Sequence, residues 1–323
     1  MSMNPTEPQF NHIVAFEVSK ADLAVHTLPA DRQQTINNTP AAVRRLLKAE
    51  QRANHKLGIG PLLVVCEATG GYERHVLEAA QALGMAVHRA HGSRTRLFAR
   101  FNGKTAKTDA IDARLIARYG LTPDLPLYDP PSPEQAALRQ LRRRRDEIQQ
   151  MLRMEANRTE HANLKRLRTS LRRHRAWLKD ELEAIEAEIE ELIGNSPELD
   201  RKATLMRSLK GVGPHTAAAI LAYLPEIGTL SKATAAAIAG LAPIANDSGQ
   251  HSGRRRIAGG RATLRASLYM AALVARHRNP TIRAFAMNLK ARGKPNKLIL
   301  TAVMRKLIVI LNAVVASGQP ARA

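Results

Sequence analysis

The chain has 323 residues, with 50 Lys and Arg against 28 Asp and Glu, a formal net charge of +22 and 44% hydrophobic residues. This length suits about two domains, the hydrophobic content excludes wholesale disorder, and the positive charge indicates a polyanionic partner, first of all nucleic acid. A single cysteine, Cys66, excludes internal disulfides and multi-cysteine metal centres, and an aromatic content of 3% argues against a single-strand binder built on base stacking.

The charge is distributed unevenly along the chain. Residues 1–138 carry a net charge of +3, residues 139–179 carry +10, residues 180–200 carry −9 and residues 201–323 carry +18. We therefore expect a nearly neutral first domain that performs chemistry and a basic remainder that holds nucleic acid. The acidic segment cannot face DNA, so we expect it to pair with a basic surface of this chain or of a second subunit.

The first 120 residues alternate between short β-rich runs and helical runs. In chain order, the pattern predicts strands at residues 12–20, 21–29 and 33–38, a helix from Pro40, a strand at 62–66, a helix at 72–83, a strand at 86–91 and a helix at about 108–119. Three strands in close succession, followed by alternating helix and strand, predict an α/β domain with a mixed sheet covered by helices.

The rest of the chain is predicted to be helical. Residues 121–134 are rich in proline and form a linker. Residues 135–200 have leucine or isoleucine at helical spacing, which predicts long helices in a coiled-coil hairpin, and residues 201–323 predict an all-α carboxyl-terminal domain. The most apolar stretch, residues 298–315, is interrupted by Arg305 and Lys306, so we expect no membrane span and a cytoplasmic protein.

Four carboxylates of the first domain can be placed by this pattern. Glu17 lies in the first strand, Glu67 ends the apolar run LLVVCE, and Asp109 and Asp112 share one face of the last helix. Carboxylates gathered at a half-buried site suit Mg²⁺, which also takes substrate phosphates. The alternative is local pairing, in which Glu17 pairs with Lys20, Glu67 pairs with Arg74, and Asp109 caps its helix.

Two glycine-rich segments of the carboxyl-terminal domain are candidates for nucleic-acid contacts. The segment LKGVGPHTAAAILAYL resembles a helix-hairpin-helix element, in which the backbone amides around Gly211 and Gly213 would bind a DNA phosphate. The alternative is an ordinary interhelical turn. The segment IANDSGQHSGRRRIAGG contains Ser248 and Ser252 beside three arginines that would hold an attacked phosphate; the alternative is a flexible basic loop.

The long helices carry further basic clusters. Their arginines and lysines are equally consistent with a solvated helix face and with phosphate contact. The candidate nucleic-acid-binding residues of the whole chain are Gly211, Gly213, Lys165, Arg166, Arg172, Arg173, Arg254, Arg255 and Arg256.

Taken together, these residues resemble a known family over nearly the entire chain. The chain is similar to the DEDD-type insertion-sequence transposases, which are bridge-RNA-guided serine recombinases with a RuvC-like amino-terminal domain. The resemblance rests on the segments FEVSK (16–20), CEATGGYE (66–73), KTDAIDARLIA (107–117), GVGPHTA (211–217), IAGLAP (238–243), NDSG (246–249), RRRI (254–257) and SLYMAAL (267–273).

The resemblance implies a role for each domain. Residues 1–120 would form a RuvC-like (RNase H-like) metal-binding domain, residues 135–200 a coiled coil for assembly, and residues 201–323 the domain with the nucleophile. A structured noncoding guide RNA would pair with donor and target DNA, and the protein would act as a dimer or tetramer.

The resemblance also assigns roles to single residues. Glu67, Asp109 and Asp112 would belong to the metal-binding set and Ser248 would be the nucleophile. Glu17 occupies the first acidic position, where the family pattern usually has the shorter aspartate.

The leading hypothesis is an RNA-guided DNA recombinase of a mobile insertion element that uses Ser248, with Mg²⁺ held by the four carboxylates. One alternative is a metal-dependent, junction-resolvase-like nuclease in which water attacks the phosphate. A second is a catalytically inactive nucleic-acid-binding relative.

Overall fold

The structure is a computed structural model that describes residues 10–103, 109–244, 247–248, 251–252 and 255–321. It divides into two compact units, Met1–Pro130 and Pro131–Ala323. Each unit has its own hydrophobic core.

The first unit is built on one mixed sheet with the strand order β3-β2-β1-β4-β5. The strands β1 (His12–Val18), β2 (Asp22–Leu28) and β3 (Arg32–Asn37) form an antiparallel meander. The strands β4 (Leu62–Glu67) and β5 (Ala86–Ala90) continue the sheet parallel to β1. The predicted α/β domain with a mixed sheet is therefore confirmed.

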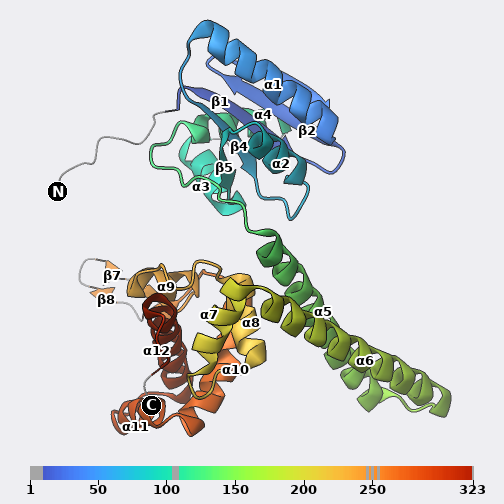
Figure 1. The fold of residues 1–323 in the computed structure, drawn as a ribbon, viewed down its shortest axis with the longest axis vertical. Helices are drawn as coiled ribbons and strands as arrows, with labels where there is room; N and C mark the ends of the chain where they lie inside the picture. Colours follow the sequence, from blue (N-terminus) through green and yellow to red (C-terminus); the bar gives the residue numbers. More distant parts are fainter. Residues whose placement is uncertain (1–9, 104–108, 245–246, 249–250, 253–254, 322–323) are drawn as a thin grey trace. The chain divides into compact units, whose positions relative to one another are not determined.

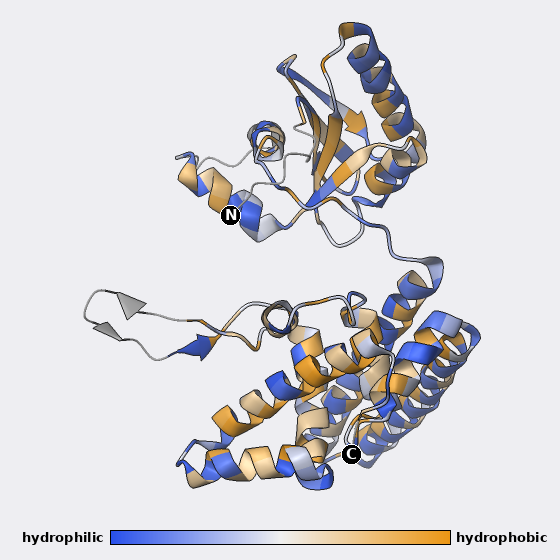
Figure 2. Ribbon diagram, turned by 60° about the vertical axis from the view of Figure 1, so that its left-hand side comes forward, coloured by the Kyte–Doolittle hydropathy of each residue, from blue (hydrophilic) through white to orange (hydrophobic). Residues whose placement is uncertain are grey.

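Helices cover both faces of this sheet because its central strands are apolar on both sides. The helices α1 (Pro40–Leu57) and α2 (Arg74–Ala82) pack on the face that carries Val14 and Phe16. The helix α4 (Asp109–Gly120) packs on the opposite face, against Ile13 and Ala15. The covering helices alternate hydrophobic and hydrophilic residues (Figure 2), as expected when one side faces a core.

One helix of this unit, α3 (Gly92–Phe101), was not predicted from the sequence. Its segment GSRTRLFARF has only three large apolar residues, and two of them, Leu97 and Phe101, are 63% and 86% exposed. Its start is fixed by the His91 side chain, which accepts a hydrogen bond from the Ser93 amide at 3.2 Å. Histidine is not among the usual N-cap residues, so the signal is weak in sequence.

The chain that follows α4 lies along the edge strand β5. The Tyr128 amide donates to the Val87 carbonyl at 2.7 Å, and His88 Nδ1 lies 2.7 Å from the Pro126 carbonyl. The His88 ring also packs near the Tyr119 ring, with 5.7 Å between centroids. These contacts attach the proline-rich stretch to the first unit.

The second unit begins with a hairpin of two long helices, α5 (Pro133–His161) and α6 (Lys165–Asn195), seen side by side in Figure 1. Their direction is antiparallel, because Arg145 pairs with Glu186 near one end and Glu155 with His174 near the other. The predicted long helices are thus present, whereas coiled-coil packing stays a prediction.

The remaining helices of this unit enclose a single apolar core. They are α7 (Pro197–Arg207), α8 (Pro214–Tyr223), α9 (Lys232–Ile238), α10 (Ala262–Arg278), α11 (Pro280–Ala291) and α12 (Asn296–Ser317). The helix α12 is long and apolar enough to cross a membrane by length and composition. Its residues Val303, Leu307 and Leu311 are fully buried in the core of this unit, which accounts for that composition.

The prediction of an all-α carboxyl-terminal domain is wrong in one segment. Between α9 and α10, β6 (Pro243–Ile244) pairs with β9 (Arg256–Ile257), and β7 (Asp247–Ser248) pairs with β8 (His251–Ser252). Ladders of two residues leave no periodic hydrophobic pattern, so the sequence could not distinguish them from a loop.

Candidate active site

Two glutamates lie next to each other at the carboxyl ends of the central parallel strands. Phe16 of β1 is opposite Cys66 of β4, so Glu17 and Glu67 occupy the next pair of positions in the register. Because side chains alternate along a strand, both carboxylates are on the face of Ala15 and Val65, which α4 covers. Both are half-buried.

The helix α4, which packs on the same face of the sheet, carries two more acidic residues, Asp109 and Asp112. Gly120 at its end lies directly on the sheet, since a Cβ there would be 2.8 Å from Ile13 and 2.9 Å from Val65. Asp112 is half-buried, and its position along the sheet relative to the two glutamates stays a prediction.

The amino end of α3 holds the carboxylate of Glu67. Thr95 is 4% exposed, and its Oγ1 donates to Glu67 Oε2 at 3.2 Å. The first residue of the helix is Gly92, and a Cβ there would be 3.3 Å from the Glu67 carboxyl carbon and closer still to Oε1. A carboxylate at this position also faces the positive end of the helix dipole. Sequence reasoning missed Gly92 and Thr95 because it missed α3.

The loop after Glu67 is organised by a buried glutamate, Glu73, which is 2% exposed. Its carboxylate accepts hydrogen bonds from Thr69 Oγ1 at 2.9 Å and from the Gly71 amide at 2.8 Å, and forms an ion pair with Arg89, whose Nε is 3.0 Å away. Burial alone would raise the pKa of Glu73, but these bonds outweigh it and lower the pKa to about 2. Glu73 is therefore ionised in the folded state, and its contacts hold this loop in place.

The fit of this edge to Mg²⁺ depends on its donors, which are hard carboxylate oxygens of the kind that this ion prefers. Among the side chains that the structure describes, no three His, Cys, Asp or Glu residues come together as a metal site. The side chain of Asp109 lies outside that set. The local pairing considered for Glu67 is not seen, since Arg74 pairs with Glu78 at 3.5 Å.

The candidate nucleophile, Ser248, lies in β7 of the second unit, opposite His251 of β8. Ser252 is opposite Asp247 in the same ladder, and the side chains of both serines are outside the described set. Arg254 also lies outside the described residues, whereas Arg255 and Arg256 are exposed.

The other candidate nucleic-acid contacts belong to two places in the second unit. Gly211 and Gly213 form the turn between α7 and α8, and Gly213 caps α8 without a side-chain hydrogen bond. The other four, Lys165, Arg166, Arg172 and Arg173, are exposed on the first turns of α6.

The comparisons with known proteins identify the class of protein as a transposase. A DEDD-type IS110 transposase domain matches residues 18–169, and a domain of the IS116/IS110/IS902 transposase family matches residues 203–286. The chain is 30% identical over 270 residues to the pilin gene-inverting proteins of Moraxella lacunata and Moraxella bovis, covering 82% of this chain and 84% of each relative. The chain belongs to the IS110 family of DEDD-type insertion-sequence transposases, as its motifs had indicated.

Two further similarities are more limited. An IS110 insertion-element protein of Streptomyces coelicolor is 30% identical over 138 residues, which is 42% of this chain and 33% of that protein. The structure of T. thermophilus RuvC in complex with a Holliday junction aligns to 36% of this chain and 99% of RuvC, at 13% identity and a TM-score of 0.27. That score is too low to support a shared fold.

Proposed function

We propose that this transposase is an RNA-guided DNA recombinase that joins strands through a phosphoserine intermediate. The observation that supports it most is the position of Glu17 and Glu67 at adjacent carboxyl ends of β1 and β4, on the face of the sheet that α4 covers. In this proposal Glu17, Glu67, Asp109 and Asp112 hold Mg²⁺ beside a DNA phosphate. The ion would neutralise charge that develops on the phosphate and leaving oxygens.

The covalent step conserves the phosphodiester. Ser248 Oγ loses its proton and attacks phosphorus; the new Oγ–P bond forms as the bond to one deoxyribose oxygen breaks, and that oxygen leaves as a hydroxyl. A hydroxyl of a second strand then attacks the phosphoserine, restores a DNA phosphodiester and returns the serine. No external energy source is needed, because one phosphate ester replaces another at each step.

The partners in this proposal are donor DNA, target DNA, a structured noncoding RNA and further copies of the chain in a dimer or tetramer. Base pairing with the RNA would select the sequences, and the protein would bind backbone and shape. The net charge of +18 over residues 201–323 supports a backbone-binding role for the carboxyl-terminal part. Arg254, Arg255 and Arg256 follow Ser248 closely enough in sequence to be assigned to the attacked phosphate.

The test is a search for a covalent adduct. The full chain is incubated with Mg²⁺, labelled element-junction DNA and candidate RNA, and the products are separated under denaturing conditions. We expect an adduct with the wild type and with Ser252→Ala, the matched control from the same ladder. Ser248→Ala is expected to give none, and Glu67→Gln is expected to reduce the yield.

Each alternative gives a different result in this assay. Cleaved DNA without an adduct would indicate a metal-dependent nuclease in which water attacks. An adduct that Ser248→Ala retains would refute the assigned nucleophile. Binding without either product, once cognate RNA and DNA are supplied, would identify an inactive nucleic-acid-binding relative.

A further inference from the structure

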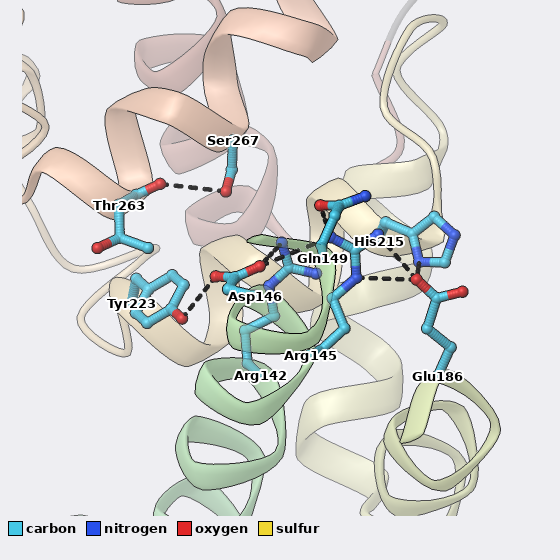
Figure 3. Close-up of polar contacts among 9 residues, drawn as sticks. All are labelled: Arg142, Arg145, Asp146, Gln149, Glu186, His215, Tyr223, Thr263 and Ser267. Carbon is cyan, nitrogen blue, oxygen red and sulfur yellow. Dashed lines mark hydrogen bonds and ion pairs between the residues drawn. The ribbon is translucent and has the colours of Figure 1, made fainter. Parts of the chain in front are cut away.

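The second unit contains a large open cleft whose lining includes, among the residues assigned above, the turn at Gly211 and Gly213. Its volume is about 1090 Å³, and it is lined by α5, by the turn before α8 and by α10. Figure 3 shows its polar wall, where side chains of α5 meet Tyr223 of α8 and face the hydroxyl-bearing residues Thr263 and Ser267 of α10.

Two buried arginines form the wall of the cleft on α5. Arg142 and Arg145 are 5% and 8% exposed. Asp146 accepts a hydrogen bond from the Tyr223 hydroxyl at 2.9 Å and lies 3.0 Å from Arg142 and 3.6 Å from Arg145. Glu186 of α6 completes the cluster, 2.8 Å from Arg145. These ion pairs hold the side chains of the wall in place, because a buried charge is costly without an oppositely charged partner.

The buried cluster has one hydrogen-bond donor without a partner within the described contacts. Arg142 Nε has no hydrogen-bond partner there, and burial, which opposes the charged form, lowers the pKa of this guanidinium. Five arginines but only two carboxylates, Asp146 and Glu147, line the cleft. The excess of positive charge favours an anionic ligand.

Two exposed arginines of α5 have no ion-pair partner in the described part of the chain. Arg139 and Arg153 both line the cleft, whereas Arg143 pairs with Glu147 at 3.2 Å. Fourteen residues separate them, which is close to four helical turns, so they point from the same face about 21 Å apart. This distance corresponds to about six base-pair steps along a duplex axis, so the two side chains would reach separate phosphates.

The floor of the cleft offers further donors. The helix α8 begins there at Gly213 with no side-chain cap. Its first residue, Pro214, has no amide hydrogen, and the Thr216 amide donates to the Gly213 carbonyl at 3.1 Å, so the His215 amide is the donor left for a ligand among the described contacts of this turn. Gly211, with φ +108°, allows this turn to approach α10, because a Cβ there would be 2.6 Å from the Ala275 Cβ. Uncapped helix amides and hydroxyls are common partners of phosphate oxygens.

We infer that the cleft between α5 and α10 binds the sugar–phosphate backbone of a nucleic acid, with Arg139 and Arg153 contacting separate phosphates. The inference rests on the proposed function for the origin of the nucleic acid, which is the DNA substrate or the guide RNA. A small anion would not span both arginines, and the short supply of aromatic side chains leaves backbone contact as the main mode of binding.

The test compares the salt dependence of binding in single variants of the full chain. The probes are a labelled duplex DNA and an RNA hairpin, each of about 20 base pairs, which is longer than the roughly six base-pair steps that separate the two arginines. For Arg139→Gln and for Arg153→Gln we expect the slope of log K against log salt to fall by about 0.9 in magnitude per lost phosphate contact. The matched control is Arg144→Gln, which removes the same charge from α5 outside the cleft, where Arg144 lies 3.6 Å from Glu147.

The probe whose slope changes identifies the ligand as DNA, RNA or both. An unchanged slope in the cleft variants, or an equal loss in Arg144→Gln, would overturn the inference. The inference would also be overturned if poly-glutamate competed with the labelled probe as well as unlabelled nucleic acid of the same total charge does, since the site would then bind any acidic chain. If the wild type forms the covalent adduct and the cleft variants keep the wild-type slope, the inference about the cleft is refuted while the proposed function stands. Lower slopes without any adduct would contradict the proposed function alone.

Discussion

Removing the charge of Glu73 is expected to destabilise the first unit in a pH-dependent way. The folded pKa of about 2 lies well below the ordinary value of 4.5, so the carboxylate stays ionised in the folded state under conditions where the unfolded state takes up a proton. A difference of about 2.5 pKa units corresponds to about 3 kcal/mol. That stabilisation is complete above about pH 4.5 and is lost as the pH falls toward about 2.

The variant Glu73→Gln keeps the shape of the side chain and abolishes this titration. We expect the wild type to be more stable than the variant by about 3 kcal/mol near neutral pH, and this advantage to shrink by about 1 kcal/mol by about pH 3.5. The contact with Arg89 is lost in the variant, while Gln can still accept from Thr69 and Gly71.

The single cysteine provides the assay for this prediction. Cys66 is fully buried in the first unit, and burial raises the pKa of its thiol to about 12, so it is inert until that unit unfolds. Urea unfolding is followed by the reaction of this thiol with a dithiodipyridine, which remains active in mild acid. A stability difference between wild type and Glu73→Gln that does not change with pH would refute the reasoning.

Two further substitutions test the packing of each unit. Gly92→Ala should force the Glu67 carboxylate from its place and cost roughly 1–3 kcal/mol by the same thiol assay. Gly194→Ala, at a helical position of the second unit with nothing near the new methyl group, should not lower the stability of that unit in urea unfolding followed by the single tryptophan. Asn312→Leu removes a 6% exposed amide that accepts from the Gly228 amide at 2.9 Å, so we expect a loss of about 2–4 kcal/mol in urea unfolding followed by the single tryptophan; a loss below about 1 kcal/mol would contradict this account.

The sequence predicted the first unit well because its elements have strong local patterns. Fully apolar strands, such as the run that ends at Glu67, and the helix that starts at Pro40 follow from hydrophobic spacing and from proline at the first helical position. The helix α3 could not be predicted, because its start depends on the cap by His91 and on the approach of Gly92 to Glu67, neither of which is visible in local sequence.

The acidic site was only partly visible in the sequence. A glutamate at the end of a buried strand suggested chemistry at Glu67, and the family motifs pointed to Asp109, Asp112 and Ser248. The parallel pairing of β1 with β4, which makes Glu17 the neighbour of Glu67, is a tertiary fact. So is the packing of α4 on this face of the sheet.

The arginine run of α5 shows why charge alone could not separate solvated from ligand-binding residues. Two of its members, Arg142 and Arg145, are buried, a position that arginine takes only with partners, and their partners come from the same helix and from the acidic segment of α6. The ion pair between Arg145 and Glu186 shows that one residue of the acidic segment pairs with a basic residue of this same chain. The exposed arginines of the same cleft, Arg139 and Arg153, remain available because the described carboxylates around them have other partners: Asp146 and Glu186 pair with the buried arginines, Glu147 with Arg143, and Glu226 with Arg261.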